Sequence, residues 1–172
     1  PLIDKNGRII LTSTGEGQIG VSRSTDRGWA YGLSRDGKTL WQTELPDMPI
    51  QPSLYLAEGD LVIHTVKSGE VVALHAADGS LAWKFNAGGT LQSSATLLSG
   101  HAIPMIAVTS HEGTFSLHDA RTGATLALQR IGHDSTSSPV AQGDRVYVAT
   151  AYALQAFGGL HALAAAQTPV TP

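Results

Sequence analysis

The chain contains seven histidines, whose neutral imidazoles are common ligands of first-row metal ions. His111 and His118 flank one expected strand, and His75 and His118 fall at nearby positions of a repeat described below, so adjacent repeats could bring them together. No pair has the close spacing typical of a zinc site, and the sequence fixes no third ligand. The sequence therefore favours histidines in turns and at strand ends that hydrogen-bond the backbone, and it predicts no metal site.

No catalytic site is expected from the nucleophilic residues. The chain has no cysteine, which excludes disulfides, thiolate metal sites and cysteine nucleophiles. His133, Asp134 and Ser135 are adjacent in sequence, but adjacency does not make a catalytic triad, and there is no Gly-x-Ser-x-Gly nucleophile elbow. The glycine-rich stretches 15–17 and 88–89 lack the strand-to-helix context of a phosphate-binding loop and are interpreted as turns.

The composition is that of a folded chain of short strands. Hydrophobic residues make up 42% of it and charged residues only 15%, with 19 glycines and 8 prolines. The net charge of -3 provides no basic surface for a polyanion, so nucleic acid is not an expected partner. No apolar run approaches the roughly 18–20 residues that span a bilayer, so no membrane span is expected.

One β-hairpin pattern occurs several times along the chain. Residues 69–83 give the clearest copy, with a short apolar strand, a tight turn at Asp78-Gly79 and a returning strand, and residues 31–41 and 113–127 repeat it. Four turn glycines lie 42, 44 and 36 residues apart: Gly37, Gly79, Gly123 and Gly159. A period of about forty residues with four strands is typical of a propeller blade.

The predicted fold is therefore an all-β propeller of four-stranded antiparallel blades. About four blades are expected, at residues 1–47, 48–90, 91–133 and 134–163, with a C-terminal tail at 164–172. Asn6-Gly7 marks the first hairpin, and residues 13–28 form the longest expected loop. The fourth unit shortens after Thr150, and residues 161–167 could equally form a helical turn.

These residues resemble the quinoprotein-type repeat, which is named for dehydrogenases that bind pyrroloquinoline quinone and is shared by non-catalytic propellers. Its signature is an Ala, an Asp two residues later, Thr-Gly, and a Trp four residues after the Gly. Residues 73–83 keep the Ala, the Gly and the Trp, and residues 117–127 keep the Asp and the Thr-Gly. The opening Ser137-Ser138-Pro139-Val140 is similar in style to the periplasmic lipoprotein of the outer-membrane β-barrel assembly machinery.

The resemblance implies structural roles for the tryptophans and the turn glycines. In the family the Trp docks flat between neighbouring blades, which suits an indole because it covers much apolar area and its N–H can reach a carbonyl. Trp41 and Trp83 are therefore expected to dock blades, together with the turn glycines Gly37, Gly79 and Gly123.

Four blades do not close a ring, because propellers of this family have seven or eight. The open blade faces would be an aggregation liability. We expect either part of a longer propeller, completed by blades of the same chain, or two copies that complete an eight-bladed ring.

The expected function is non-catalytic, without a cofactor: a scaffold that binds another protein or peptide through its loops or through an exposed strand edge. Envelope protein assembly, in the periplasm or outside the cell, is the process that the resemblance implies. The alternative is part of a quinone-dependent dehydrogenase whose catalytic residues lie outside this chain. The candidate partner-binding residues are loop positions that no blade core requires: Arg23, Asp26, Arg27, Glu58, Asp60, His111, Glu112 and Asp144.

Overall fold

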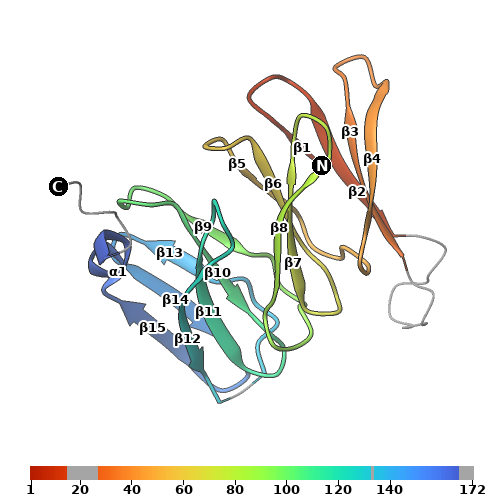
Figure 1. The fold of residues 1–172 in the computed structure, drawn as a ribbon. Helices are drawn as coiled ribbons and strands as arrows, with labels where there is room; N and C mark the ends of the chain where they lie inside the picture. Colours follow the sequence, from red (N-terminus) through yellow and green to blue (C-terminus); the bar gives the residue numbers. More distant parts are fainter. Residues whose placement is uncertain (15–26, 133, 167–172) are drawn as a thin grey trace.

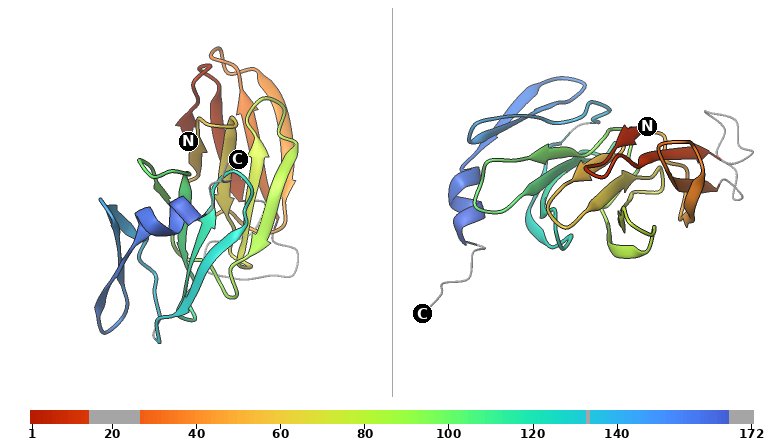
Figure 2. Two further views of the ribbon diagram at one scale, coloured as in Figure 1. Left: turned by 60° about the vertical axis from the view of Figure 1, so that its left-hand side comes forward. Right: turned by 90° about the horizontal axis from the view of Figure 1, so that it is seen from above.

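A computed structural model describes residues 1–14, 27–132 and 134–166 of the chain. This part contains three four-stranded antiparallel sheets and one three-stranded sheet, each with its strands in sequence order. The sheets stand face to face in chain order, as blades do (Figure 1; Figure 2). The predicted all-β propeller architecture is confirmed.

The strands follow the hairpin pattern of the sequence. The first sheet has β1 (Leu2–Ile3), β2 (Ile9–Thr14), β3 (Gly28–Leu33) and β4 (Thr39–Leu45), and the second has β5 (Leu54–Leu56), β6 (Leu61–Thr65), β7 (Glu70–His75) and β8 (Leu81–Asn86). The third has β9 (Thr96–Leu98), β10 (Met105–Thr109), β11 (Thr114–Asp119) and β12 (Thr125–Arg130). Each strand pairs antiparallel with the next one along the chain, so the connections alternate between two ends of the molecule.

The fourth sheet departs from the four-strand unit. It has β13 (Val140–Gln142), β14 (Arg145–Ala149) and β15 (Leu154–Gly158), and the chain then turns into the helix α1 (Leu160–Ala166). Of the two conformations left open for this stretch, the helix is the one observed, because Leu160 and Ala164 pack into the apolar layer between the third and fourth sheets. The unit boundaries derived from the sequence stay a prediction.

Three apolar layers hold the four sheets together, one at each junction. Val62, Val72 and Leu74 pack toward the first sheet, whereas their neighbours Leu61 and Ile63 pack toward the third. The strands β6 and β10 are therefore buried along their whole length, which explains why their sequences are mostly apolar. In β3 and β14, at the two ends of the series, buried residues alternate with more exposed ones.

Of the innermost strands, β9 lies against both β5 and β13, as at the centre of a propeller. No helix among the described residues is long and apolar enough to cross a membrane.

Candidate functional site

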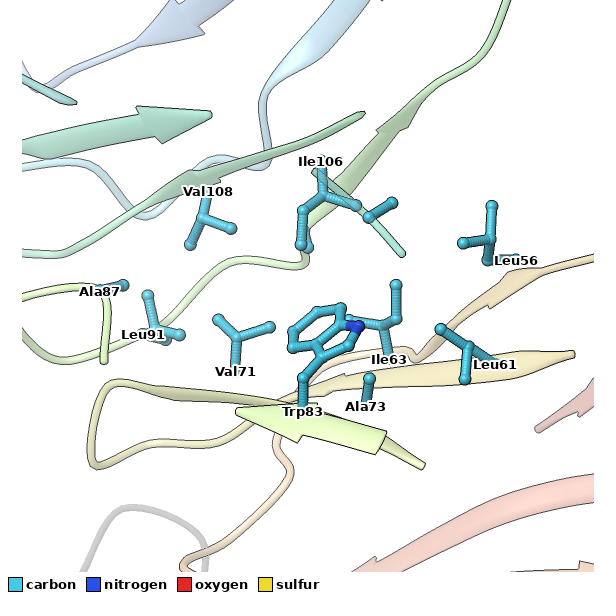
Figure 3. Packing of buried hydrophobic residues seen from close by; sticks show 12 residues of the cluster. Leu56, Leu61, Ile63, Val71, Ala73, Trp83, Ala87, Leu91, Ile106 and Val108 are labelled. Carbon is cyan, nitrogen blue, oxygen red and sulfur yellow. The ribbon is translucent and has the colours of Figure 1, made fainter. Parts of the chain in front are cut away.

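Tryptophan and glycine meet at two of the blade junctions. Trp41 of β4 lies against the β7–β8 turn, where its Nε1 donates a hydrogen bond to the Ala76 carbonyl at 3.0 Å. A Cβ on Gly79 would lie 2.5 Å from the Trp41 ring, so the indole covers the glycine closely. Trp83 of β8 covers Gly123 of the third sheet in the same way, with a corresponding distance of 2.8 Å. The indole of Trp83 lies among Ile63, Val71 and Ile106 in Figure 3.

The two junctions differ in hydrogen bonding. The Nε1 of Trp83 is buried and has no hydrogen-bond partner among the residues that the structure describes. At the end of the series, Gly37 has no atom within 4 Å of the Cβ position, so its turn carries no docked indole.

Charged residues link the first two sheets at the end of the molecule that holds the β1–β2 and β5–β6 turns. The Arg8 guanidinium contacts Asp4 and also Asp60, whose Oδ2 lies 2.6 Å from Arg8 Nη2. The other Asp60 oxygen accepts a hydrogen bond from the Tyr55 hydroxyl at 2.7 Å. Burial works against ionisation of Asp60, but the hydrogen bonds from Tyr55 and Arg8 outweigh it and hold the pKa of this carboxyl below its ordinary value.

A second charged link joins the second and third sheets at the same end. Arg121 Nη2 lies 2.7 Å from Asp119, and Arg121 Nη1 lies 3.8 Å from Glu58. Burial of Asp119 is outweighed by its hydrogen bonds with Arg121, so the pKa of the carboxyl is lowered. The Glu58 contact is exposed and long, so it adds little stability.

The third link joins the third and fourth sheets and consists of two histidines and an aspartate. His101, in the loop between β9 and β10, has its Nδ1 3.1 Å from the Nδ1 of His161 on α1. Asp144, in the β13–β14 turn, accepts hydrogen bonds from the backbone N–H groups of Gly159 and His161. Burial and the nearby His161 lower the pKa of His101, against the opposing effect of Asp144. This is the one group of metal-ligating side chains that the described residues bring together.

The histidine pair considered in the sequence does not form a ligand set. His118 is buried and stacks on Phe85, with ring centroids 3.7 Å apart, and its Nε2 contacts the Ser116 hydroxyl at 2.9 Å. Burial lowers the pKa of His118 to about 4 although the Gly123 carbonyl opposes this, so the ring is neutral at pH 7. His75 is exposed at the end of β7.

The candidate partner-binding residues lie at two opposite ends of the molecule. Arg23 and Asp26 fall outside the described residues. Glu58, Asp60 and Asp144 lie in turns that follow the first strand of a sheet, whereas the remaining three lie at the other end: Arg27, His111 and Glu112. These residues therefore form no single patch.

Most of these side chains already have partners. Arg27 pairs with Glu44 at 2.8 Å, and Glu112 accepts a hydrogen bond from the Thr90 backbone N–H at 2.7 Å. Asp60 links two sheets, as described above. His111 has a buried Nδ1 that finds no hydrogen-bond partner in the described part of the chain. Their role in binding a partner stays a prediction.

Sequence reasoning missed Arg8, His101 and His161. Four turn glycines stand at equivalent positions of the four units, and the residues that follow them are Arg8, Asp60, His101 and Asp144. Neighbouring blades bring equivalent turns together, so Arg8 meets Asp60, and His101 lies beside Asp144. The repeat could have revealed these pairs, but not His161, which depends on the formation of α1.

A half-open apolar cavity of about 390 Å³ lies between the third and fourth sheets at their outer strands. Its lining includes Phe115 of β11 stacked on Phe157 of β15, with ring centroids 4.4 Å apart, together with Leu128 of β12 and Leu163 of α1. Ala127 lines it at the repeat position that Trp41 and Trp83 occupy in the preceding units. Among the described residues, β15 has no strand on its outer edge.

The family model described as outer membrane protein assembly factor BamB matches residues 26–126 of the sequence. The chain belongs to this family. The match covers the two Trp-Gly junctions of this BamB-family chain, and the resemblance to PQQ-like repeats is confirmed. No curated protein matches the chain significantly.

Solved structures with similar folds include a BamB protein and a quinohemoprotein dehydrogenase. BamB from Moraxella catarrhalis superposes with a TM-score of 0.67 at 22% identity, covering 91% of this chain and 44% of that one. The quinohemoprotein alcohol dehydrogenase ADHIIG from Pseudomonas putida HK5 gives a TM-score of 0.59 at 16% identity, covering 83% of this chain and 31% of that one. At these identities the likeness shows the fold, and the chain spans less than half the length of either structure.

Proposed function

We propose that the chain is a non-catalytic β-propeller scaffold that binds an extended segment of another protein, and that it acts in protein assembly at the cell envelope, in the periplasm or outside the cell. The observation that carries this proposal is the outer edge of β15, which pairs with no strand of the described residues and lies beside the apolar cavity. The BamB family match supports the assembly role.

The edge and the cavity offer the two components of strand recognition. An added strand would bond to the backbone groups that point outward from β15, and main-chain hydrogen bonds provide affinity in this mode. Alternate side chains of that strand would point toward β12 and the cavity. Leu128 of β12 and Phe157 of β15 line the cavity. An extended segment with alternating apolar residues therefore fits this place.

Hydrogen exchange of the chain with a synthetic peptide tests this proposal. The probe is an extended peptide of alternating apolar and polar residues, and the control peptide has the same composition with prolines that prevent strand pairing. The probe should protect the amides of β15 and leave the other edge strands unchanged. The proposal would be contradicted if the probe did not protect β15, or if the proline peptide protected β15 equally.

A pair of leucine substitutions separates the cavity from the rest of the surface. Leu128 is 69% exposed at the side of the cavity, and Leu40 is 50% exposed on β4, the equivalent strand of the first sheet. Leu128→Lys should weaken peptide binding by roughly tenfold, because it places a charge in the apolar contact. Leu40→Lys should leave the affinity unchanged, and an equal effect of the two variants contradicts this location.

The alternative is part of a quinone-dependent dehydrogenase, for which the similarity to the Pseudomonas putida enzyme gives a fold but no site. Addition of pyrroloquinoline quinone with Ca²⁺ distinguishes the two, because a bound cofactor shows its own absorbance after gel filtration. The scaffold proposal expects none to elute with this chain.

A further inference from the structure

We infer that His101, Asp144 and His161 form a binding site for a divalent transition-metal ion, of which Zn²⁺ is the model, at the junction of the third and fourth sheets. The three potential ligand atoms lie within 4.8 Å of one another. They come from three separate elements: the β9–β10 loop, the β13–β14 turn and α1.

The distance between the two imidazoles suits a shared metal ion. Two nitrogens bound to tetrahedral zinc at about 2.0–2.1 Å lie roughly 3.3 Å apart, which follows from the tetrahedral angle. The Nδ1 atoms of His101 and His161 are 3.1 Å apart. When each ring carries its proton on Nε2, both Nδ1 atoms have a free lone pair available to a cation.

Asp144 is held in place for a role as third ligand. Its Oδ1 accepts a hydrogen bond from the His161 backbone N–H at 2.6 Å, and its Oδ2 accepts one from Gly159 at 3.1 Å. Each carboxylate oxygen retains a second lone pair, so these bonds fix the carboxylate without preventing coordination. The carboxylate also supplies negative charge to balance part of the charge of the ion.

The ligand types and their exposure define the class of ion. Two imidazoles with one carboxylate favour Zn²⁺, Ni²⁺ or Cu²⁺ over Mg²⁺ and Ca²⁺, which prefer oxygen ligands. His101 and Asp144 are half-exposed and His161 is exposed, so an ion can enter from solvent. Three protein ligands leave the remaining coordination position to water.

The site would connect the fourth sheet to the third. Arg8 with Asp60 and Arg121 with Glu58 link the first three sheets at this end, and a bound ion would provide the corresponding link at the last junction. Because α1 carries His161 and packs on both sheets, binding would restrain the helix as well.

Calorimetric titration of the tag-free chain with ZnCl₂ tests the site. One Zn²⁺ per chain should bind, and the thermal unfolding midpoint should rise with Zn²⁺ concentration, because the ion binds the folded state. Equal concentrations of Mg²⁺ should change neither. Zn²⁺ should also slow hydrogen exchange in α1.

Three single variants locate the binding residues. His101→Gln and His161→Gln should each weaken Zn²⁺ binding at least about tenfold, since each removes one of two imidazole ligands. His75→Gln is the matched control, because His75 is an exposed histidine of the second sheet that is not part of the group. Circular dichroism verifies that each variant is folded.

Two outcomes would overturn the inference. One is the absence of saturable Zn²⁺ binding by the wild-type chain. The other is an equal loss of binding in His75→Gln and in the two site variants, which would show adventitious binding by surface histidines. Neither outcome concerns the peptide site at β15, so each proposal is tested independently of the other.

Discussion

Trp41 and Trp83 occupy the same repeat position and are equally buried, each 8% exposed, but only Trp41 has a partner for its indole N–H. The carbonyl that corresponds to Ala76 in the third sheet belongs to Ala120, and Trp83 does not reach it. A comparison of the two tryptophans therefore separates the stabilisation from burial of the indole from the stabilisation by its hydrogen bond.

The substitutions Trp41→Phe and Trp83→Phe measure this difference. Both remove similar ring area, but Trp41→Phe also breaks a buried hydrogen bond and leaves the Ala76 carbonyl without it. We expect Trp41→Phe to lower the free energy of unfolding by about 1 kcal/mol more than Trp83→Phe. Urea unfolding of both variants measures the difference, and equal losses would show that Trp83 bonds a carbonyl in solution.

Among single residues, the sequence predicts those whose pattern lies within one hairpin. It misses those that are brought together only by the packing of distant segments. The turn glycines and tryptophans stand at fixed spacings within one hairpin, so they were recognisable before any fold was known. His101 and His161 are 60 residues apart, and only the packing of α1 on the third and fourth sheets brings them together. The candidate partner-binding residues share only their loop positions, which say nothing about the contacts of Asp60 with Arg8 and Tyr55.

Among the elements, the β-hairpin turns after the third strand differ in what covers them. Gly37, Gly79 and Gly123 share a left-handed backbone, with φ of +83°, +72° and +74°. Gly79 and Gly123 lie under an indole, whereas Gly37 has open space around its Cβ position. The same substitution therefore meets the same backbone strain in all three turns but a steric clash in only two.

Substitution of each of these glycines by alanine should separate the cost of the left-handed backbone from the cost of the steric clash. A left-handed alanine costs about 1–2 kcal/mol, and this should be the whole effect of Gly37→Ala. Gly79→Ala and Gly123→Ala should cost roughly 1–3 kcal/mol more, because the methyl group pushes the indole out of its place. Chemical denaturation of the three variants checks this order, and equal losses would contradict close docking of the tryptophans.

Most elements were predictable because their physical causes lie in neighbouring residues. Alternating or continuous apolar runs bounded by Gly and Asp turns indicate a hairpin from the sequence alone, as at residues 69–83, where the structure has β7 and β8. The stretch that forms α1 is rich in Ala and Leu, which fit a helix or the last strand of a blade equally well. Its conformation depends on burial of Leu160 and Ala164 against the third sheet.

For the whole molecule, apolar side chains are exposed on the two outermost sheet faces, and they affect how the chain behaves in solution. On the first sheet, Ile3 pairs with Ile9, which in turn pairs with Leu33, and Leu2 points the opposite way into the core. On the fourth sheet, Val140 pairs with Tyr147, and Leu154 pairs with Ala149, on the face opposite the buried Val146 and Val148. Ile3 is 70% and Leu154 is 72% exposed, at positions where an inner sheet is covered by the next blade.

We therefore expect this chain to self-associate through its two end faces, either as a ring of two copies or as larger assemblies. The mass measured by light scattering should rise with protein concentration, because burial of apolar sheet faces drives the association. The double substitution of Ile3→Lys and Leu154→Lys should shift the chain toward the monomer. Leu81→Lys, at a leucine that is 55% exposed on β8 of an inner sheet, is the matched control and should leave the mass unchanged. A chain that is monomeric at every concentration would show that these faces are stable in water, and blade completion would then not be needed for solubility.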